Sequence, residues 1–366
     1  MRQLLFFSLA FLSFALNAQI TEIYVSDAGN FNNPPWQILK FDENGQNPTV
    51  FIDTNIDWPQ DILFVEDANR VLISNLNSNL INWHDATTGA YIGLFANGIN
   101  GPTRMKIGPD SLLYVLQWGG NGRVLRYQLD GSFVDEFTSV GVSNSIGLAW
   151  DAIGNLYVSS YDGDYVRHFD SQGNDLGLFA ITNLDGPTNI WFDDKGNLLV
   201  VDYDGNAVKR FDPAGVYDGI FMSGLGNAEG VAFMANGDIL IGNGATSSVK
   251  RYDDSGTYLN EFVASGAGNL LNPNAVVIRE NNTTSIRKPL TESASIVRPN
   301  HGREFALALS PQQRAKQIQV YRVDGRLVGE IRERSWSAED LPAGFYVVVA
   351  DLQDGRRLRQ KIMLSH

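Results

Sequence analysis

Short apolar segments recur along most of the chain, separated by turns rich in glycine, asparagine and aspartate. Within these segments, β-branched and aromatic residues alternate with polar ones, as in TNIWFDDKGNLLVVD (188–202). This two-residue period predicts β-strands, because a helix would place its apolar residues three and four positions apart. We therefore expect an all-β fold.

One motif repeats six times. It begins with an apolar residue, which is usually followed by a basic residue, then a ring, then an acidic residue and finally glycine. The copies are ILKFDENG (38–45), INWHDATTG (81–89), VLRYQLDG (124–131), VRHFDSQG (166–173), VKRFDPAG (208–215) and VKRYDDSG (249–256). Their ring positions are 41 to 43 residues apart: Phe41, His84, Tyr127, Phe169, Phe211 and Tyr252. Four strands in a period of about 42 residues match a propeller blade better than a helical repeat.

Each end of this region carries part of a repeat. The segment EIYVSDAGN (22–30) aligns with the second strand of the other copies and has no strand before it. The segment NPNAVVIRE (272–280) aligns with that missing first strand. Pairing the two would complete one blade from both ends and leave no free sheet edge. We expect residues 19–280 to form a six-bladed β-propeller closed in this way.

The repeat units GNLLVVDYDGNAVKRFD and GNLYVSSYDGDYVRHFD resemble NHL repeats and the wider six-bladed group that contains gluconolactonase-like proteins. The resemblance covers roughly residues 20 to 280. It is specific for the fold and weak for activity, because propellers host many unrelated functions.

The chain begins MRQLLFFSLAFLSFALNAQ, in which Arg2 precedes an apolar run from Leu4 to Leu16 and Ala18 precedes Gln19. This order is typical of a cleaved signal peptide, here residues 1–18. The alternative, a membrane anchor, would need a longer apolar run. No later segment is apolar enough to span a membrane, so we expect no membrane span in the mature form and export to the periplasm.

The net charge of −13 is unevenly distributed. Through Pro289 there are 16 basic against 32 acidic residues, and from Leu290 onward there are 12 against 9. The acidic main body argues against nucleic acid or anionic lipid as a partner, because both are bound by clustered lysine and arginine. The chain has no cysteine, which excludes disulfides, Cys-ligated zinc and a thiol nucleophile.

A linker at 281–293 leads to a tail, residues 294–366, with strands expected near 304–309, 316–323, 326–332, 344–351 and 356–363. Asp-Gly turns between these strands predict a small β-sandwich. A generic carbohydrate-binding or immunoglobulin-like domain is one interpretation.

The tail resembles more closely the C-terminal sorting domain of the Bacteroidota type IX secretion system. The matching pieces are Arg298-Pro299-Asn300, IQVYRVDGRLV, LPAGFYVVV and the final strand KIML, with Pro299, Asn300, Gly325 and Gly344 as motif residues. His301-Gly302 stands where that family often has a second proline. The resemblance implies the type IX machinery as a partner, and a protein that is secreted or attached at the outer-membrane surface.

Loops at one face of a propeller converge on the mouth of its central channel, where ligands favour a preformed cavity. We predict ligand contacts there from Trp36, Trp118, Tyr161, Asp162, Asn189, Tyr203 and Asp204. Flat rings stack on sugar faces while amides and carboxylates bind hydroxyl groups, so a glycan or a protein ligand is the preferred hypothesis. The alternative is that these residues only make turns and pack between blades.

The resemblance to gluconolactonase-like proteins also implies a divalent ion in the channel. Glu229 and Asn274 stand at matching positions, and Asp61 or Gln60 could join them to form a set that would suit Ca²⁺. That arrangement would support a metal-dependent lactone hydrolase. The alternative is ordinary polar channel residues, since no histidine base is expected at the mouth and no G-x-S-x-G motif occurs.

The spacing of Asp202, Asp204 and Asn206 is that of the first ligands of a calcium-binding loop. Such a loop needs glycine at its sixth position and glutamate at its twelfth, where this chain has Ala207 and Pro213. We therefore interpret DYDGN as a hairpin turn at the channel mouth.

Overall fold

The computed structural model describes residues 19–282, 296–298, 301–309, 315–322, 327–332, 335–352 and 357–364. It divides into two compact units, Met1–Thr283 and Thr284–His366. The expected signal peptide, most of the linker, and Pro299, Asn300 and Gly325 of the tail motif lie outside the described residues. Within them, no helix is both long and apolar enough to cross a membrane.

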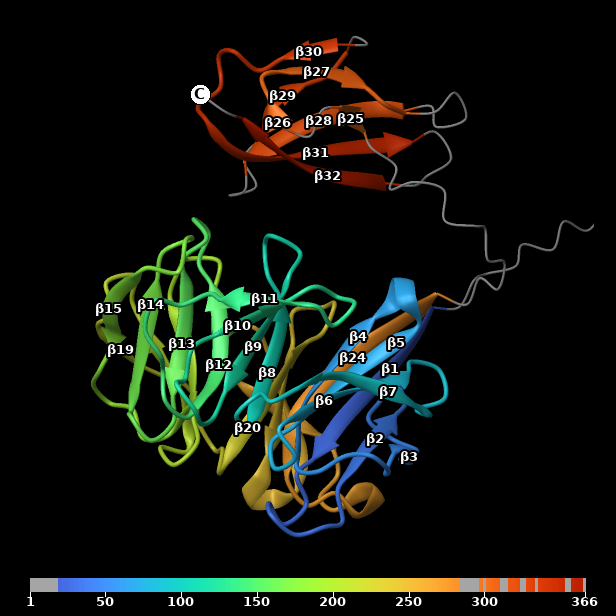
Figure 1. The fold of residues 1–366 in the computed structure, drawn as a ribbon, viewed down its shortest axis with the longest axis vertical. Coiled ribbons are helices and arrows are strands. Elements are labelled where there is room, and N and C mark those ends of the chain that lie inside the picture. The colour runs from blue at the N-terminus through green and yellow to red at the C-terminus, as the bar shows by residue number, and fades with distance from the viewer. Residues whose placement is uncertain are drawn as a thin grey trace, which may run out of the picture. The chain divides into compact units, whose positions relative to one another are not determined.

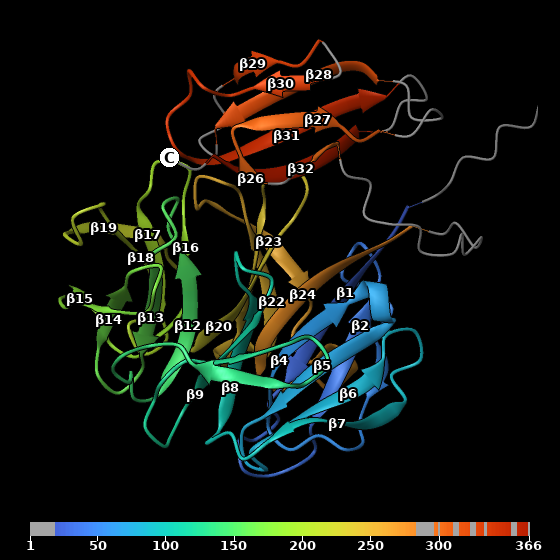
Figure 2. The same cartoon turned by 45° about the horizontal axis from the view of Figure 1, so that its top comes forward.

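Unit 1 is built from six four-stranded antiparallel sheets, which Figures 1 and 2 show fanned around a common axis. The innermost strands are β24 (Pro273–Asn282), β4 (Pro59–Val65), β8 (Pro102–Ile107), β12 (Ser145–Trp150), β16 (Pro187–Phe192) and β20 (Ala228–Phe233). The second strands are β1 (Gln19–Asp27), β5 (Arg70–Asn75), β9 (Leu113–Gln117), β13 (Leu156–Ser160), β17 (Leu198–Asp202) and β21 (Ile239–Asn243). The all-β propeller prediction is confirmed.

The third and outer strands complete each blade. The third strands are β2 (Gln37–Phe41), β6 (Leu80–Asp85), β10 (Leu125–Tyr127), β14 (Tyr165–Phe169), β18 (Ala207–Phe211) and β22 (Ser248–Tyr252). The outer strands are β3 (Thr49–Ile52), β7 (Tyr91–Asn97), β11 (Phe133–Glu136), β15 (Asp175–Ala180), β19 (Tyr217–Met222) and β23 (Tyr258–Val263). Short 3₁₀ turns are η1 (Glu66–Ala68), η2 (Gly244–Thr246) and η3 (Ala267–Asn269).

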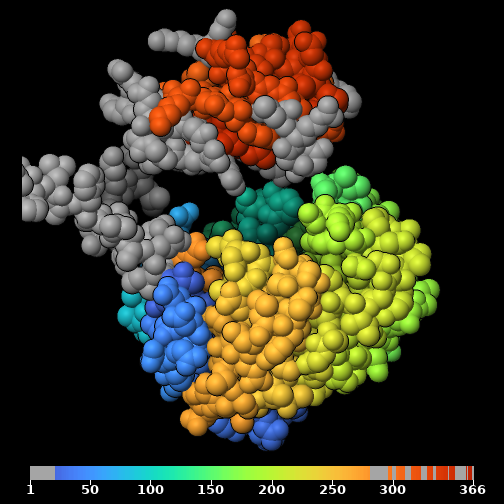
Figure 3. All heavy atoms as spheres, turned by 180° about the vertical axis from the view of Figure 1, so that it is seen from behind, coloured from blue at the N-terminus to red at the C-terminus, as the bar shows by residue number. Residues whose placement is uncertain are grey.

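The first blade joins the two ends of the unit, because β24 pairs along the whole of β1. Successive innermost strands contact one another from β4 through β8, β12, β16 and β20 to β24, and β24 in turn contacts β4. The first and last blades share an apolar core that includes Phe41 and Phe262. In the space-filling view their blue and gold surfaces lie side by side (Figure 3).

Three positions of the repeated motif have a structural explanation, which the copy at 166–173 illustrates. The ring, for example Phe169, is fully buried between blades. The aspartate that follows, Asp170, accepts backbone N–H bonds from Gln172 and Asn174 and so closes the turn. Gly173 has φ +81°, and a Cβ there would collide with the carbonyl oxygen of Phe137 in the preceding blade. The motif therefore specifies both a tight turn and its fit against the neighbouring blade.

The register between the first and second strands shifts near the channel in every blade. These β-bulges release backbone carbonyls that side chains of the adjacent blade then bind. Thr103 Oγ1 donates to Ser145 O at 2.7 Å, and Asn274 Nδ2 donates to Pro59 O at 2.7 Å. The hydrogen bonds around the channel hold neighbouring blades in register and fix the residues that face the axis.

The described part of unit 2 consists of a three-stranded and a five-stranded sheet. The first contains β25 (Val297–Arg298), β27 (Glu304–Leu307) and β30 (Ser335–Ser337). The second contains β26 (His301–Gly302), β32 (Arg357–Leu364), β31 (Gly344–Leu352), β28 (Ala315–Arg322) and β29 (Leu327–Glu330). Phe305 of one sheet packs in a common core with Val320 and Val348 of the other. Gly344, at the start of β31, has φ +146°.

Candidate functional site

Each second strand ends in a buried or nearly buried polar residue beside the loop that enters its own blade. Five of these side chains accept a loop N–H. The donors are Asn272 for Asp27, Asp57 for Asn75, Asn100 for Gln117, Asp185 for Asp202 and Gly226 for Asn243, at 2.7 to 3.2 Å. Asp202 also forms an ion pair with Lys209. The aspartate that begins the apparent calcium loop is therefore a structural clamp.

The residue after this clamp lies at the mouth of the channel. In three consecutive blades it is aromatic, namely Trp118, Tyr161 and Tyr203. These rings line a cavity of about 260 Å³, to which Phe31 and Trp58 also contribute. Gln60, Thr188 and Glu229 of the innermost strands line it as well. Five rings and a few polar groups thus surround one concave space, as in many small-ligand sites.

The rings are arranged edge-to-face or tilted. Trp118 and Tyr161 have centroids 5.7 Å apart, and Tyr161 and Tyr203 have centroids 5.8 Å apart. Phe31 and Trp58 form a second pair at 5.6 Å. The Tyr161 hydroxyl donates to Asp204 Oδ2 at 2.7 Å, which links the loops of two neighbouring blades. Contacts of this kind hold the ring faces in place before any ligand arrives.

The structure brings together only some of the predicted ligand residues. Trp118, Tyr161 and Tyr203 line the cavity, and Asp204 orients Tyr161. Three others do not line it: Asp162 is exposed on its loop, Asn189 lies in the channel, and Trp36 donates its indole N–H to Phe31 O at 2.7 Å.

Phe31 and Trp58 were missed by the sequence analysis. Both residues have left-handed backbone angles, φ +52° and +49°, in loops that do not follow the repeat. For Trp58 the sequence offers one signal: it directly precedes the innermost strand β4, a position that lies at the channel mouth.

The predicted metal ligands converge around the side chain of Arg104. Its Nη2 donates to Glu229 Oε1 at 2.7 Å and to Asn274 O at 2.5 Å, and its Nη1 donates to Gln60 O. Its Nε donates to Asn189 Oδ1 at 3.1 Å. Asp61 lies 3.8 Å from Nη1, and Asn189 Nδ2 donates to Glu229 O at 2.6 Å. The guanidinium, which is almost fully buried, connects five innermost strands across the channel.

These residues fit an internal guanidinium better than a divalent cation. Glu229 Oε1 and two backbone oxygens already accept hydrogen bonds from Arg104. Among the described residues, no group of three or more histidine, cysteine, aspartate or glutamate side chains could hold a metal ion. A hard cation such as Ca²⁺ takes six to eight oxygen ligands, and it would meet the positive charge of Arg104 here.

Burial dominates the electrostatics of the channel. It raises the pKa of Glu229 to about 7, against the lowering effect of Arg104. Burial likewise raises the pKa of Asp61, although Arg104 and the backbone N–H groups of Met105 and Ile62 oppose it. One guanidinium is thus shared between two buried carboxyl groups. Beyond it the channel continues as a cavity of about 150 Å³ lined in part by Asp61, Lys106 and Asn189.

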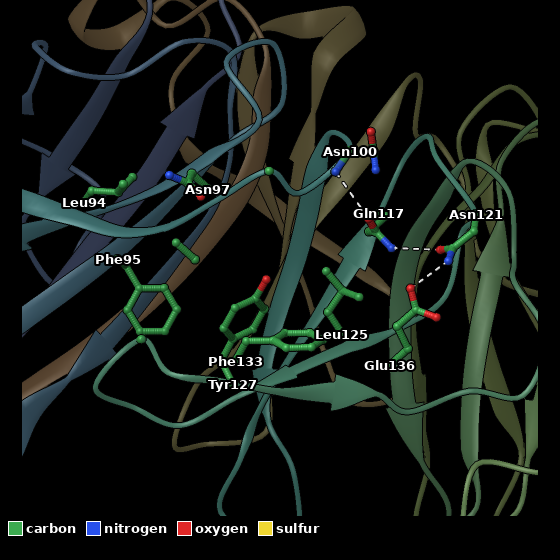
Figure 4. Close-up of a pocket in the computed structure, with 13 residues that line it drawn as sticks. Leu94, Phe95, Asn97, Asn100, Gln117, Asn121, Leu125, Tyr127, Phe133 and Glu136 are labelled. Carbon is green, nitrogen blue, oxygen red and sulfur yellow. Dashed lines mark hydrogen bonds between the residues drawn. The ribbon is translucent and has the colours of Figure 1, made fainter.

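A second, more open cavity of about 620 Å³ lies between the second and third blades (Figure 4). Its polar wall is a chain of hydrogen bonds that runs from Gln117 through Asn121 to Glu136. Phe133 is 57 % exposed there, and the buried Tyr127 lies beside it. The third strand of this blade, β10, has only 3 residues.

No protein-family model matches this chain, and no curated protein matches its sequence. Solved structures do match its fold. The nidogen/laminin complex aligns with a TM-score of 0.58 at 15% identity, over 71% of this chain and 98% of that one. A protein of unknown function from Bacteroides caccae aligns with a TM-score of 0.57 at 14% identity, also over 71% and 98%.

The structural neighbours also include a gluconolactonase from Xanthomonas campestris, at 20% identity and a TM-score of 0.47, over 56% of this chain and 75% of that one. The fold is that of a β-propeller. At these identities the likeness shows the fold alone, and the propeller's function has to be argued from its own residues.

Proposed function

We propose that this protein is a binding module that takes a glycan or a protein ligand at the mouth of the propeller channel. The observation that carries the proposal is the convergence of Trp118, Tyr161 and Tyr203 with Phe31 and Trp58 on one cavity. Ring faces offer a ligand a large contact area with little loss of side-chain freedom. The polar groups at the strand ends then supply orientation.

A binding function is favoured over hydrolysis because the polar side chains of the channel bind one another. Glu229 and Asp61 flank Arg104, so the two carboxyl groups expected to hold a metal have an internal cationic partner. Asn274 offers Arg104 only its backbone oxygen, and its buried Oδ1 accepts no hydrogen bond from the described residues. The two described histidines in the propeller, His84 and His168, lie on third strands β6 and β14 rather than at the mouth. No described arrangement supports a step of lactone hydrolysis.

We also propose that the protein reaches its site of action by export through the type IX secretion system. Support comes from the apolar N-terminal segment, residues 1–18, and from the tail pieces that include Arg298-Pro299-Asn300 and LPAGFYVVV. Deleting residues 294–366 in the native host should leave the propeller in the periplasm. Normal secretion or surface display of the truncated chain would contradict this route.

Glycan and peptide arrays probed with the full-length chain test the binding function. Array hits should be lost in Trp118→Ala and retained in Phe133→Ala, which removes an exposed ring from the side cavity between the second and third blades. Circular dichroism would check that both variants fold. An absence of hits, or hits that survive Trp118→Ala, would overturn the proposal.

A further inference from the structure

The loops on the mouth face of the propeller carry a strongly one-sided charge. They follow the second strands or precede the innermost strands of the six blades, and so lie at one end of every sheet. Their carboxylates are Asp53, Asp57, Asp162, Asp164, Asp185 and Asp204. The only basic residue in these loops is Arg123, which is paired with Glu136 at 3.0 Å. Two lysines reach this face from the third strands: Lys209 pairs with Asp202, and Lys250 donates to Gly224 O at 2.6 Å. The six loop aspartates still outnumber these basic groups. A field of this sign attracts cations to the mouth.

A buried carboxyl group of the same sign lies on the inner wall of the mouth cavity. Glu229 is 8 % exposed and lines the space enclosed by the five rings. Its Oε1 accepts the hydrogen bond from Arg104, whereas its Oε2 accepts none from the residues that the structure describes. Arg104 does not itself line this cavity, and it is shared with Asp61. Glu229 therefore has an unused acceptor and an incompletely balanced charge on the mouth side.

The ring faces add a third attraction for positive charge. The face of an aromatic ring carries negative potential, and tryptophan attracts ammonium groups more strongly than the other aromatic side chains do. Trp58, Trp118, Tyr161 and Tyr203 all line the cavity. Neutral sugars also stack on such rings and can donate hydroxyl hydrogen bonds to a carboxylate, but only a cation gains Coulombic attraction from the six aspartates.

We propose that the mouth cavity binds an alkylammonium group, which lies among the rings of Trp58, Trp118, Tyr161 and Tyr203 and faces Glu229. This inference rests on the proposed binding function and names the chemistry of the ligand. A cation at this place would stabilise the ionised form of Glu229, whose pKa burial raises to about 7. Binding at neutral pH would then release protons.

Choline and 3,3-dimethyl-1-butanol form a matched pair of probes, since they differ by N⁺ in place of a carbon atom. Calorimetric titration of the full-length chain should show saturable choline binding, with the neutral alcohol at least about tenfold weaker. Added salt should weaken choline and leave the alcohol unaffected. The measured heat should also change between buffers of different ionisation enthalpy, as proton release requires.

Two variants separate charge from packing. Glu229→Gln should weaken choline by about tenfold or more and change the alcohol little. Because a channel variant can disturb folding, the exposed Asp162→Asn provides a second test and should weaken choline by up to about threefold through the field alone. Equal affinity for the two probes, or no choline binding at tens of millimolar, would overturn the inference. If array hits were then still lost in Trp118→Ala, the binding function would stand without its cationic ligand; if not, both would fail.

Discussion

The Arg104 guanidinium donates a hydrogen bond to Glu229 Oε1 at 2.7 Å across the central channel of the propeller. The two residues belong to β8 and β20, strands that do not neighbour each other in the ring. The pair therefore connects two blades that are not adjacent, across the central channel. It also separates the mouth cavity, which Glu229 lines, from the smaller cavity beyond.

Replacing Arg104 by methionine should destabilise the protein strongly. The change would leave Glu229 and Asp61 as two buried carboxyl groups without their shared cation, at a cost of about 3–5 kcal/mol of unfolding free energy. Urea denaturation measures this. The matched control is Arg210→Met, since the side chains of Arg210 and its partner Asp218 are 35 % and 54 % exposed, and its loss should stay below about 1 kcal/mol. Similar losses in both variants would show that the channel pair has no special role.

Glu229 should make the stability of the protein depend on pH. Its folded-state pKa of about 7 lies above the ordinary value of 4.5, so the folded state binds its proton more tightly than the unfolded state does. The resulting stabilisation is present below about pH 4.5 and disappears as pH rises through about 7. A shift of this size corresponds to roughly 3 kcal/mol. Between pH 5 and pH 8 the wild type should therefore lose more unfolding free energy than Glu229→Gln does. Equal losses in the two proteins would refute the raised pKa of Glu229.

Gly173→Ala should destabilise the contact between the third and fourth blades. The new Cβ would collide with Phe137 O, and φ is +81°. The expected loss exceeds about 1 kcal/mol. Gly93→Ala, in β7, is the control because a Cβ there meets nothing within 4 Å. That variant should stay within about 0.5 kcal/mol of the wild type by thermal or chemical unfolding. A reversed order would contradict the structural explanation of the repeated glycine.

Tyr161→Phe should have a small effect on ligand affinity compared with Tyr161→Ala. The phenylalanine variant keeps the ring between Trp118 and Tyr203 and loses only the hydrogen bond to Asp204. We expect a change of about 1 kcal/mol in binding free energy for Tyr161→Phe. Losing the ring should cost about 1–3 kcal/mol more, measured by titration with a ligand of the mouth cavity. Equal losses would assign the role of Tyr161 to its hydroxyl group alone.

Much of the architecture could be predicted from sequence, because the same pattern recurs in every blade and because each strand and turn is specified by residues close together in the chain. The alternation of apolar and polar residues specified the strands, and the aspartate and glycine of each copy specified the turns, as Asp170 and Gly173 illustrate. Trp118, Tyr161 and Tyr203 could be placed at the channel mouth because they occupy the same position of the repeat.

The remaining parts of the site depend on features that do not repeat. Phe31 and Trp58 reach the cavity from irregular loops with left-handed residues, whose paths a strand pattern does not specify. The contacts of Arg104 with Glu229 and Asn274 depend on the reach of a long side chain across the ring, which a strand pattern does not specify. Trp36 was expected to contact a ligand because its loop is rich in asparagine and aromatic residues. Its indole N–H instead donates to Phe31 O within the same loop.

Ligand binding at the channel mouth is tested most directly by an NMR titration that follows the indole N–H signals of the full-length chain, assigned through single Trp→Phe variants. Choline should shift the signals of Trp58 and Trp118, which line the mouth cavity, while those of Trp83 and Trp191, which do not, should stay in place. Unchanged Trp58 and Trp118 signals at saturating ligand, or shifts confined to the other tryptophans, would contradict a binding site at the mouth of the propeller.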